Sequence, residues 1–263
     1  MEGLEVSRDG AVALVTLNRP EVRNAFNEAL IAALHETFVA LDRDPEVRVV
    51  VFGAQGPAFC AGADLNWMKK MAGYTFDENE ADALCLADML YAIDQCSKPV
   101  IARVHGDVYA GGMGLVAACD IAVASTNAQF CLSETRLGLI PATIGPYVIR
   151  ALGEQAARRY VLSAERFDAA EAYRLGFIHE LVQPDELDER VGEIVDALLL
   201  CSPQALAAAK RLVREVGSQP VTPSLRADTA RRIAQARASE EGREGVKSFL
   251  EKRKPRWVVD QKK

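Results

Sequence analysis

A glycine-rich turn and a single acidic side chain lie near each other in the middle of the sequence. Gly111 and Gly112 precede an apolar stretch with the composition of a helix, and Glu134 follows inside an otherwise apolar run. Glycines bring bare backbone N–H groups close to a ligand, and the start of a helix adds unpaired donors and a positive dipole end. These residues predict a site that stabilises negative charge and carries its own acid/base, Glu134.

A second turn of the same kind lies upstream. There, an apolar strand expected over residues 47–52 continues through GAQGPAF into CAGADL at 60–65. Either turn alone is also typical of an ordinary strand-to-helix connection. Together they could direct one N–H each at one oxygen, and the chemistry that most needs such donors is conversion of a thioester carbonyl to an enolate. We therefore expect an oxyanion hole.

Composition narrows the class of protein. The 263 residues suffice for one large α/β domain, with or without a helical appendage, and 49% of them are hydrophobic. A net charge of −6 argues against a nucleic-acid partner. The first ten residues lack the basic and apolar regions of a signal, and no apolar run reaches the roughly 18 residues of a membrane span. We expect a cytoplasmic protein without a membrane partner.

Cysteines and histidines contribute little to the predicted chemistry. The six cysteines have no CxxC spacing and lie mostly in apolar surroundings, which indicates buried free thiols rather than disulfides or zinc ligands. The histidines are expected to have surface or packing roles. His35 lies in an amphipathic helix, His179 at a helical exit and His105 at a strand end.

The expected elements alternate between strands and helices before a helical tail. An Asp9-Gly10 turn predicts a hairpin between 4–6 and 11–17. From residue 155 onward the pattern predicts almost only helix, including AAEAYRLGFIHELV with a stop at Gly176, and amphipathic tail helices that pack on the core or on a neighbouring subunit. The other expected elements are helices at 27–41 and 81–94, strands at 100–104 and 121–124, and tail helices at 203–216 and 229–252.

Several ordered motifs are more specific than any one glycine pattern. AFCAGADL at 58–65 and GGMGLVAACDIAVAS at 111–125 are followed by AQFCLSE and LGLIP at short fixed spacing. Further matches extend from LNRPEVRNAFN at 17–27 to EGVKSFLEKRKPRW at 244–257. Together these motifs resemble the enoyl-CoA hydratase/isomerase family, also called the crotonase superfamily.

This resemblance implies a fold, an assembly and a ligand. It implies an α/β crotonase-like spiral of ββα units over residues 1–200, with the acyl-CoA site. Residues 201–263 would form a C-terminal helical trimerisation region, giving a homotrimer or a dimer of trimers. The N–H groups of Ala63 and Gly111 would hold the thioester oxygen. Coenzyme A would enter as part of the substrate, with no permanently bound cofactor and no metal.

Other residues match positions that contact coenzyme A in the family. For Arg23 and Lys252 a solvated surface charge is the alternative, and for Asp64 the alternative is a favourable acid in the first turn of a helix. The matching positions are Val22, Arg23 and Ala25 for the pantetheine and phosphates, Ala61, Asp64 and Leu65 for the adenine side, and Phe249 and Lys252 for a neighbouring subunit's coenzyme A.

The chain departs from the family at the first of two glutamates. Two-glutamate hydratases have a Glu where this chain has Gly114, and their second corresponds to Glu134; Ala142 and IGPYV also replace the usual glycine and GGTQR. One glutamate could move both protons of a syn hydration, or shift a proton between two carbons as an isomerase does. Loss of an acid also fits a catalytically weak acyl-CoA-binding scaffold. If the pocket has room, Gly114→Glu is expected to restore a second carboxylate.

A narrower resemblance favours hydration. DLNWMKKM, GLVAACDIAVAS and SETRLGLIPATIGPYVIRALG are similar to bacterial enzymes of the methylglutaconyl-CoA hydratase type, which act in leucine and isoprenoid breakdown. This implies a branched or carboxylated enoyl chain, whose distal carboxylate could meet Lys69, Lys70 or Arg136 unless these are plain surface cations. The residues expected around the acyl chain are Trp67, Met68, Gly112, Gly114 and Ala142.

Overall fold

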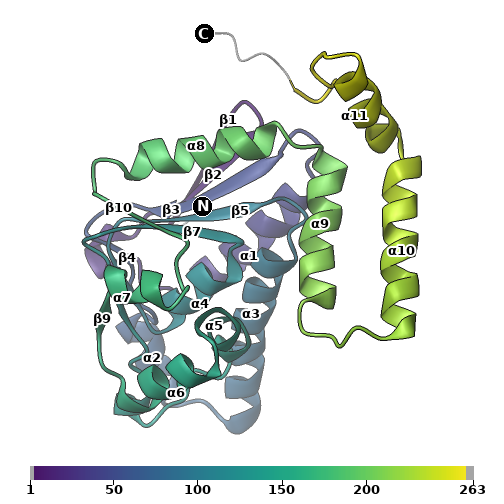
Figure 1. Cartoon of the computed structure of the whole chain (residues 1–263). Coiled ribbons are helices and arrows are strands. Elements are labelled where there is room, and N and C mark those ends of the chain that lie inside the picture. The colour runs from purple at the N-terminus through teal and green to yellow at the C-terminus, as the bar shows by residue number, and fades with distance from the viewer. Residues whose placement is uncertain (1–2, 259–263) are drawn as a thin grey trace.

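The larger of two sheets forms the centre of the molecule. The computed structural model describes residues 3–258 and contains a six-stranded sheet in the order β1-β2-β3-β5-β7-β10, antiparallel only between β1 and β2 (Figure 1). The expected hairpin is present, with Gly10 at φ 54° in its turn. The strands are β1 (Leu4–Asp9), β2 (Val12–Leu17), β3 (Val49–Ala54), β5 (Val100–Val104), β7 (Ile121–Ser125) and β10 (Glu180–Val182).

Both faces of this sheet are covered, which explains why β3 is apolar at every position. On one face, α1 (Glu28–Arg43), α3 (Phe76–Gln95) and α4 (Gly111–Ala118) enclose the main core. On the other face, Val51, Ile101 and Val123 pack against Leu187 and Val191 of α8 (Leu187–Leu199) (Figure 1). The core therefore lies on both sides of the large sheet.

A smaller sheet carries the two glycine turns. Its order is β4-β6-β8-β9, with β4, β6 and β8 parallel and β9 antiparallel to β8. Two short 3₁₀ helices flank strands of this sheet along the chain: η1 comes before β4, and η2 comes after β8. The bounds are β4 (Ala58–Cys60), β6 (Asp107–Tyr109), β8 (Gln129–Cys131), β9 (Phe167–Asp168), η1 (Pro20–Val22) and η2 (Glu134–Leu137).

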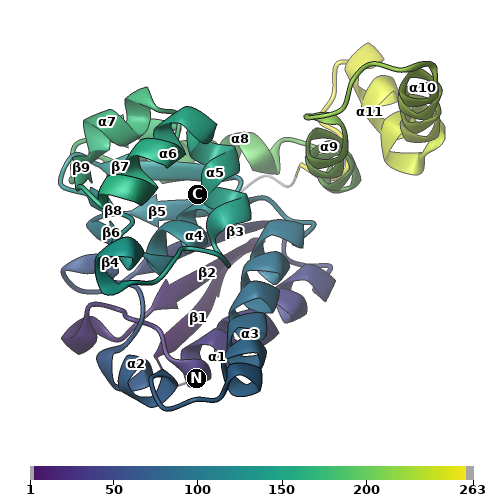
Figure 2. The same ribbon diagram turned by 90° about the horizontal axis from the view of Figure 1, so that it is seen from below.

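The last three helices form an arm that projects from the α/β body (Figure 2). The arm consists of α9 (Pro203–Val216), α10 (Pro223–Ala238) and α11 (Glu240–Leu250). Polar contacts hold its base: Lys210 Nζ lies 2.6 Å from Asp120 Oδ2, and Arg48 donates to the carbonyls of Cys201 and Trp257. The remaining helices are α2 (Leu65–Met71), α5 (Gly145–Leu152), α6 (Glu154–Ser163) and α7 (Ala169–Arg174).

Within residues 3–258, no single helix has both the length and the apolar composition to cross a membrane; α8 and α9, bent by 106° to each other, meet those requirements only as a pair.

Two expectations about secondary structure were wrong. The region after residue 155 is not almost wholly helical, because β9 and β10 interrupt it; AAEAYRLGFIHELV forms α7 up to Arg174 and ends in β10. Gly176, at φ 77°, does stop the helix as expected. The expected helix over 229–252 begins earlier, at Pro223, and divides at Ser239, whose side chain caps α11. Short strands have too few residues for their alternation to stand out.

Candidate active site

Three strands of the small sheet end at one edge. Because β4, β6 and β8 run parallel, the segments that follow them leave from the same side of the sheet. Ala63 follows β4, Gly111 follows β6 and Glu134 follows β8. The topology thus gathers the two expected backbone donors and the expected acid/base at the carboxyl ends of neighbouring strands.

The two glycine turns pack directly on each other. A Cβ atom added to Gly62 would lie 3.0 Å from the Cβ of Ala110 and 3.7 Å from the backbone nitrogen of Gly111. A Cβ on Gly112 would lie 2.7 Å from the carbonyl oxygen of Cys60. Gly62 also has φ +90°, which side chains rarely adopt. Glycine is therefore required for this close approach of the two backbones.

The N–H groups of Ala63 and Gly111 remain available within this tightly bonded backbone. Around Ala63, the N–H of Phe26 donates to Gly62 at 2.8 Å, and that of Asp64 donates to Phe26 at 3.0 Å. In the part of the chain that the structure describes, neither Ala63 nor Gly111 finds an acceptor for its own N–H. Unpaired donors on an ordered backbone suit a ligand oxygen.

Ala110 has a strained conformation that sets the direction of one of these donors. Its φ of 48° and ψ of −121° are unusual for a residue with a side chain. The ψ angle of Ala110 turns the peptide plane that contains the N–H of Gly111, and the N–H of Ala110 itself is fixed on Cys131 at 2.8 Å. Such strain costs about 1–3 kcal/mol and concentrates at functional sites.

Glu134 begins η2 and is incompletely satisfied. Its Oε2 atom is buried and has no hydrogen-bond partner among the described residues. Burial raises the pKa of this carboxyl above the ordinary 4.5. A carboxylate in this state can accept a proton from a ligand, as a general base requires.

Gly114 lies under an apolar side chain. A Cβ added to Gly114 would come within 2.3 Å of Cγ2 and 2.8 Å of Cβ of Ile144, which itself is 2% exposed. Ile144 thus occupies the space into which a side chain at position 114 would extend. Gly112 is also buried. Ala142 is exposed, in the turn that precedes α5.

The residues expected at the acyl chain differ in their contacts. Trp67 is buried, packs on Phe26 with ring centroids 5.9 Å apart and donates from Nε1 to Asp82 at 3.1 Å, so it contributes to helix packing. Met68 is half-buried. Of the expected cations, Lys70 is paired with Glu28 at 2.5 Å. Lys69 and Arg136 are exposed, and neither forms an ion pair with any described residue.

The expected coenzyme A contacts fall into three groups. Asp64 caps α2 and pairs with Arg19 at 2.9 Å; although burial opposes it, hydrogen bonds from Asn66 and Arg19 hold its pKa below the ordinary value. Both carboxylate oxygens of Asp64 therefore already accept hydrogen bonds from the protein. Phe249 is 82% exposed on α11, a helix of the projecting arm (Figure 2), and Lys252, just after α11, is also exposed. Val22, Arg23 and Leu65 are exposed, Ala61 is half-buried and Ala25 is buried.

Two of the histidines contact backbone groups through one ring nitrogen each. His179 Nδ1 accepts from the N–H of Ala122 at 3.0 Å, and His105 Nε2 lies 2.8 Å from the carbonyl of Gly56. All six cysteines are free as expected, although Cys85 and Cys201 are exposed rather than buried. Burial raises the pKa of Cys60, beside the first turn, to about 12. Residues 3–258 contain no cluster of three or more His, Cys, Asp or Glu placed to hold a metal.

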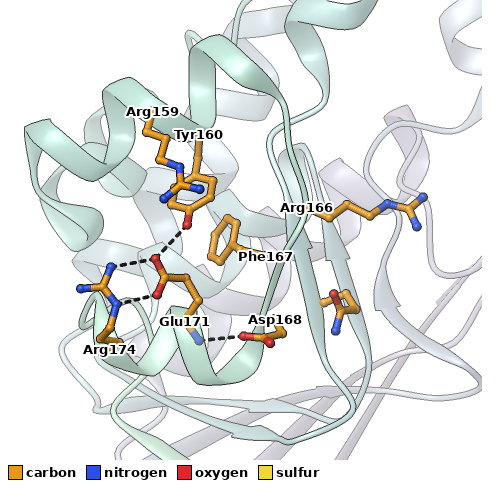
Figure 3. Close-up of a pocket in the computed structure, with 8 residues that line it drawn as sticks. Arg159, Tyr160, Arg166, Phe167, Asp168, Glu171 and Arg174 are labelled. Carbon is orange, nitrogen blue, oxygen red and sulfur yellow. Dashed lines mark hydrogen bonds and ion pairs between the residues drawn. The ribbon is translucent and has the colours of Figure 1, made fainter.

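A separate polar pocket of about 600 Å³ lies beside β9, α6 and α7 (Figure 3). Three of its charged groups are paired: Glu171 accepts from Tyr160 at 2.8 Å and from Arg174 at 2.5 and 2.8 Å, and Arg159 pairs with Glu165. Arg166 lies over the ring of Tyr109, 5.3 Å from its centroid. None of the expected site residues lines the pocket. The Tyr160–Glu171 hydrogen bond connects α6 to α7.

Two residues that the sequence did not single out hold the first turn in place. Asn24 is fully buried, donates to the carbonyls of Gln55 and Ala58 at 2.7 and 2.8 Å, and accepts from the N–H of Arg19. Arg19 also donates to the carbonyl of Ala25 at 2.6 Å. Their only sequence signal was membership of the string LNRPEVRNAFN, which gives no contact partners.

Comparisons with known proteins agree with the motifs. A family model described as enoyl-CoA hydratase/isomerase matches residues 7–260. The mevalonyl-coenzyme A hydratase sidH of Aspergillus fumigatus is 37% identical over 94% of this chain and 91% of its own. The 2,3-dehydroadipyl-CoA hydratase of Escherichia coli K12 is 35% identical over 97% of this chain and 98% of its own. A solved enoyl-CoA hydratase from Shewanella pealeana has a TM-score of 0.94 at 43% identity, and the match covers 97% of this chain and 96% of the solved one. This chain therefore belongs to the enoyl-CoA hydratase/isomerase family and has its crotonase fold.

Proposed function

We propose that the protein adds water across the double bond of an enoyl-CoA thioester, with Glu134 as the single acid/base. The observation that carries this proposal is the unpartnered, buried Oε2 of Glu134 at the same sheet edge as the free N–H groups of Ala63 and Gly111. An enolate needs donors for its oxygen and a group that moves protons at the adjacent carbons. This edge supplies both.

The proposed reaction needs one proton to be taken and returned. The Glu134 carboxylate accepts a proton from water while the water oxygen bonds to C3 of the enoyl chain. Electrons of the double bond move toward the thioester, and the N–H groups of Ala63 and Gly111 stabilise the charge on its oxygen. Glu134, now a carboxylic acid, then donates its proton to C2. The net change is addition of one water molecule.

The contact of Gly114 with Ile144 supports a mechanism with one acid. No carboxylate is available at position 114, and the side chain of Ile144 fills the adjacent space. A lone glutamate also fits a double-bond isomerase, which removes a proton at one carbon and returns it at another. We favour hydration because relatives matching over nearly the whole chain are named as hydratases.

For the substrate, we propose a branched or carboxylated chain such as 3-methylglutaconyl-CoA. The names of the two relatives contain a mevalonyl group, which is branched, and a dehydroadipyl group, which carries a second carboxylate. Arg136 lies two positions after Glu134, is exposed and has no ion-pair partner among the described residues. It is our candidate for the distal carboxylate, with Lys69 as the second.

The assembly and its coenzyme A contacts are part of the same proposal. Phe249 is exposed on α11, a helix of the arm that projects from the α/β body. A homotrimer or dimer of trimers, with Phe249 and Lys252 near a neighbour's coenzyme A, remains our prediction. We also predict a cytoplasmic location.

A substrate panel tests the proposal. Crotonyl-, 3-methylcrotonyl-, 3-methylglutaconyl- and 3-enoyl-CoA are compared by the loss or gain of conjugated thioester absorbance. The second and third differ by one carboxylate, so Arg136→Gln is expected to lower kcat/KM for 3-methylglutaconyl-CoA by roughly two- to fivefold, the worth of one exposed charge pair, and to leave 3-methylcrotonyl-CoA little changed. Equal losses on both substrates would contradict the role of Arg136. Activity on the 3-enoyl thioester alone would favour the isomerase.

A further inference from the structure

We propose that Phe26 is a positioning residue that fixes the two oxyanion-hole donors relative to each other. The inference rests on the proposed function, since it assumes that Ala63 and Gly111 bind the thioester oxygen. Phe26 contacts both turns at once, one through its backbone and the other through its ring. It makes no contact with substrate in this account and acts only through the two donors.

The backbone of Phe26 holds the turn that contains Ala63. Phe26 and Ala63 form an isolated parallel bridge. The N–H of Phe26 donates to Gly62 at 2.8 Å, and its carbonyl accepts from Asp64 at 3.0 Å. The residues on both sides of Ala63 are thereby fixed, while the N–H of Ala63 itself points to no described acceptor.

The ring of Phe26 packs on the other donor residue. A Cβ added to Gly111 would lie 2.2 Å from Cζ of Phe26 and 3.0 and 3.3 Å from its two Cε atoms. The ring therefore occupies the position where any side chain at residue 111 would project. Trp67 also packs on this ring, at 5.9 Å between centroids and an interplanar angle of 57°. In a close-packed interior these contacts restrict movement of the ring.

The segment before Phe26 is anchored independently of any ligand. Arg23 and Asn24 both have positive φ, 53° and 56°, and the fully buried amide of Asn24 bonds to carbonyls on each side of the loop before β4. Arg19 joins Ala25 to Asp64 through its guanidinium group. The position of Phe26 is therefore set by the fold, as a rigid spacer between two turns requires.

The expected consequence is a loss of donor alignment when the ring is shortened. Phe26→Leu keeps both backbone hydrogen bonds but removes the Cζ and Cε atoms that face Gly111. A displacement of about 1 Å can cost roughly 100-fold in rate, so we expect kcat to fall roughly 10- to 100-fold. Affinity for a saturated acyl-CoA should change less than about threefold, because alignment matters most for the transition state.

The first test reads the carbonyl directly. Butyryl-CoA with a ¹³C-labelled thioester carbonyl is bound to each protein, and the C=O stretching frequency is measured by infrared difference spectroscopy. Wild type is expected to lower the frequency, and Phe26→Leu to lower it less. Phe38→Leu is the matched control, because Phe38 is also fully buried and its ring packs on Phe52 at 5.7 Å rather than on Gly111. It should lower the melting temperature without changing the carbonyl shift.

The second test uses the steric relation between the two residues. Gly111→Ala keeps the N–H but places a methyl group on the Phe26 ring, so it should lower kcat. Phe26→Leu removes the atoms that this methyl meets. The double variant is therefore expected to have a higher kcat than Gly111→Ala alone.

The outcomes separate the two proposals. A wild-type carbonyl shift that Phe26→Leu retains in full, together with an unchanged kcat, would overturn the positioning role and leave the oxyanion hole standing. A double variant with a kcat no higher than that of Gly111→Ala alone would also overturn it. If butyryl-CoA bound to wild type without any carbonyl shift, the oxyanion hole itself would be wrong and the role of Phe26 with it.

Discussion

Two glutamates follow neighbouring strands of the small sheet and have opposite surroundings. Glu171, after β9, accepts hydrogen bonds from Arg174 and Tyr160, which lower its pKa to about 2 (Figure 3). Glu134, after β8, has a buried oxygen without a partner among the described residues, and burial raises its pKa. The first carboxylate is satisfied by the protein and the second is not.

The difference separates a structural acid from a candidate catalytic one. A carboxylate that already accepts three hydrogen bonds has little tendency to take a proton, whereas a desolvated one takes a proton readily. Leaving a buried oxygen unpaired costs stability, so its retention in a folded protein calls for an explanation. The volume and charge of the Figure 3 pocket are therefore weaker guides to chemistry than one unpaired oxygen at the same sheet edge as two unpaired N–H groups.

The largest expected effect comes from exchanging each glutamate for its amide. Glu134→Gln should lower kcat by roughly 100- to 10,000-fold, the usual worth of a general acid/base, while affinity for a saturated acyl-CoA barely changes. Glu171→Gln should lower the melting temperature and leave kcat near that of wild type. Steady-state kinetics and thermal unfolding of both variants make the comparison. Similar kinetic losses in the two would break the distinction drawn between these acids.

The next effect concerns the N–H of Gly111. Since any Cβ at this position meets Phe26, the donor is best removed in a Phe26→Leu background, comparing Gly111→Pro with Gly111→Ala. Both substitutions add a Cβ, but only proline deletes the N–H. Proline is tolerated at the first position of a helix, which Gly111 occupies in α4. Turnover of the proline variant should be about 100-fold or more below that of the alanine variant. Equal turnover in folded proteins would remove Gly111 from the oxyanion hole.

A third effect should appear in folding rather than in catalysis. Gly114→Glu would place its Cβ 2.3 Å from Ile144, so the variant is expected to lose about 1–3 kcal/mol or more of unfolding free energy from overpacking. The second carboxylate anticipated from the sequence has no room there. Adding Ile144→Ala should recover part of the loss, as measured by urea unfolding. Improved crotonyl-CoA hydration by Gly114→Glu alone would show that the space is available after all.

The smallest effect is a pH-dependent change in stability. The folded-state pKa of Glu134 lies above the ordinary 4.5, so ionising this group opposes folding at neutral pH. Glu134→Gln should therefore be more stable than wild type above that raised pKa, and the gain should vanish below pH 4.5, where the carboxyl is protonated in both states. Glu171 has its pKa lowered to about 2, so Glu171→Gln should be less stable above pH 4.5, with the deficit shrinking as the pH falls toward 2. Urea unfolding across this range measures both.

Much of the architecture could be predicted because it follows from residue patterns within short stretches of the chain. Helices α1 and α9 and strand β5 have apolar spacing long enough to identify, and the expected strand at 100–104 matches β5 at both ends. The small sheet was missed, since β4, β6 and β8 have three residues each and their pairing depends on contacts distant in sequence. The site was therefore expected as turns, without the sheet that aligns them.

The candidate site could be predicted only in part. Glu134 and the glycine turns carry a signal of residue type, but the packing of Phe26 on Gly111 and of Ile144 on Gly114 joins residues far apart in the chain. A sequence pattern shows which residues are apolar, but it does not show which of their side chains are in contact in the fold. Asp64 was expected at coenzyme A or as an acid in the first turn of a helix, and the sequence did not indicate that its oxygens accept from Asn66 and Arg19.

The most direct test of the central claim, hydration by one glutamate and two backbone donors, is to mix wild-type protein with 3-methylglutaconyl-CoA or crotonyl-CoA in heavy water and to follow the conjugated absorbance and the product mass. We expect loss of the absorbance and a product heavier by one D₂O, with the carbon-bound deuteron at C2. The same mixture with Glu134→Gln should retain its absorbance although the thioester is bound. A wild-type protein that binds the thioester and leaves its spectrum unchanged, or a Gln variant that hydrates at the wild-type rate, would contradict the account.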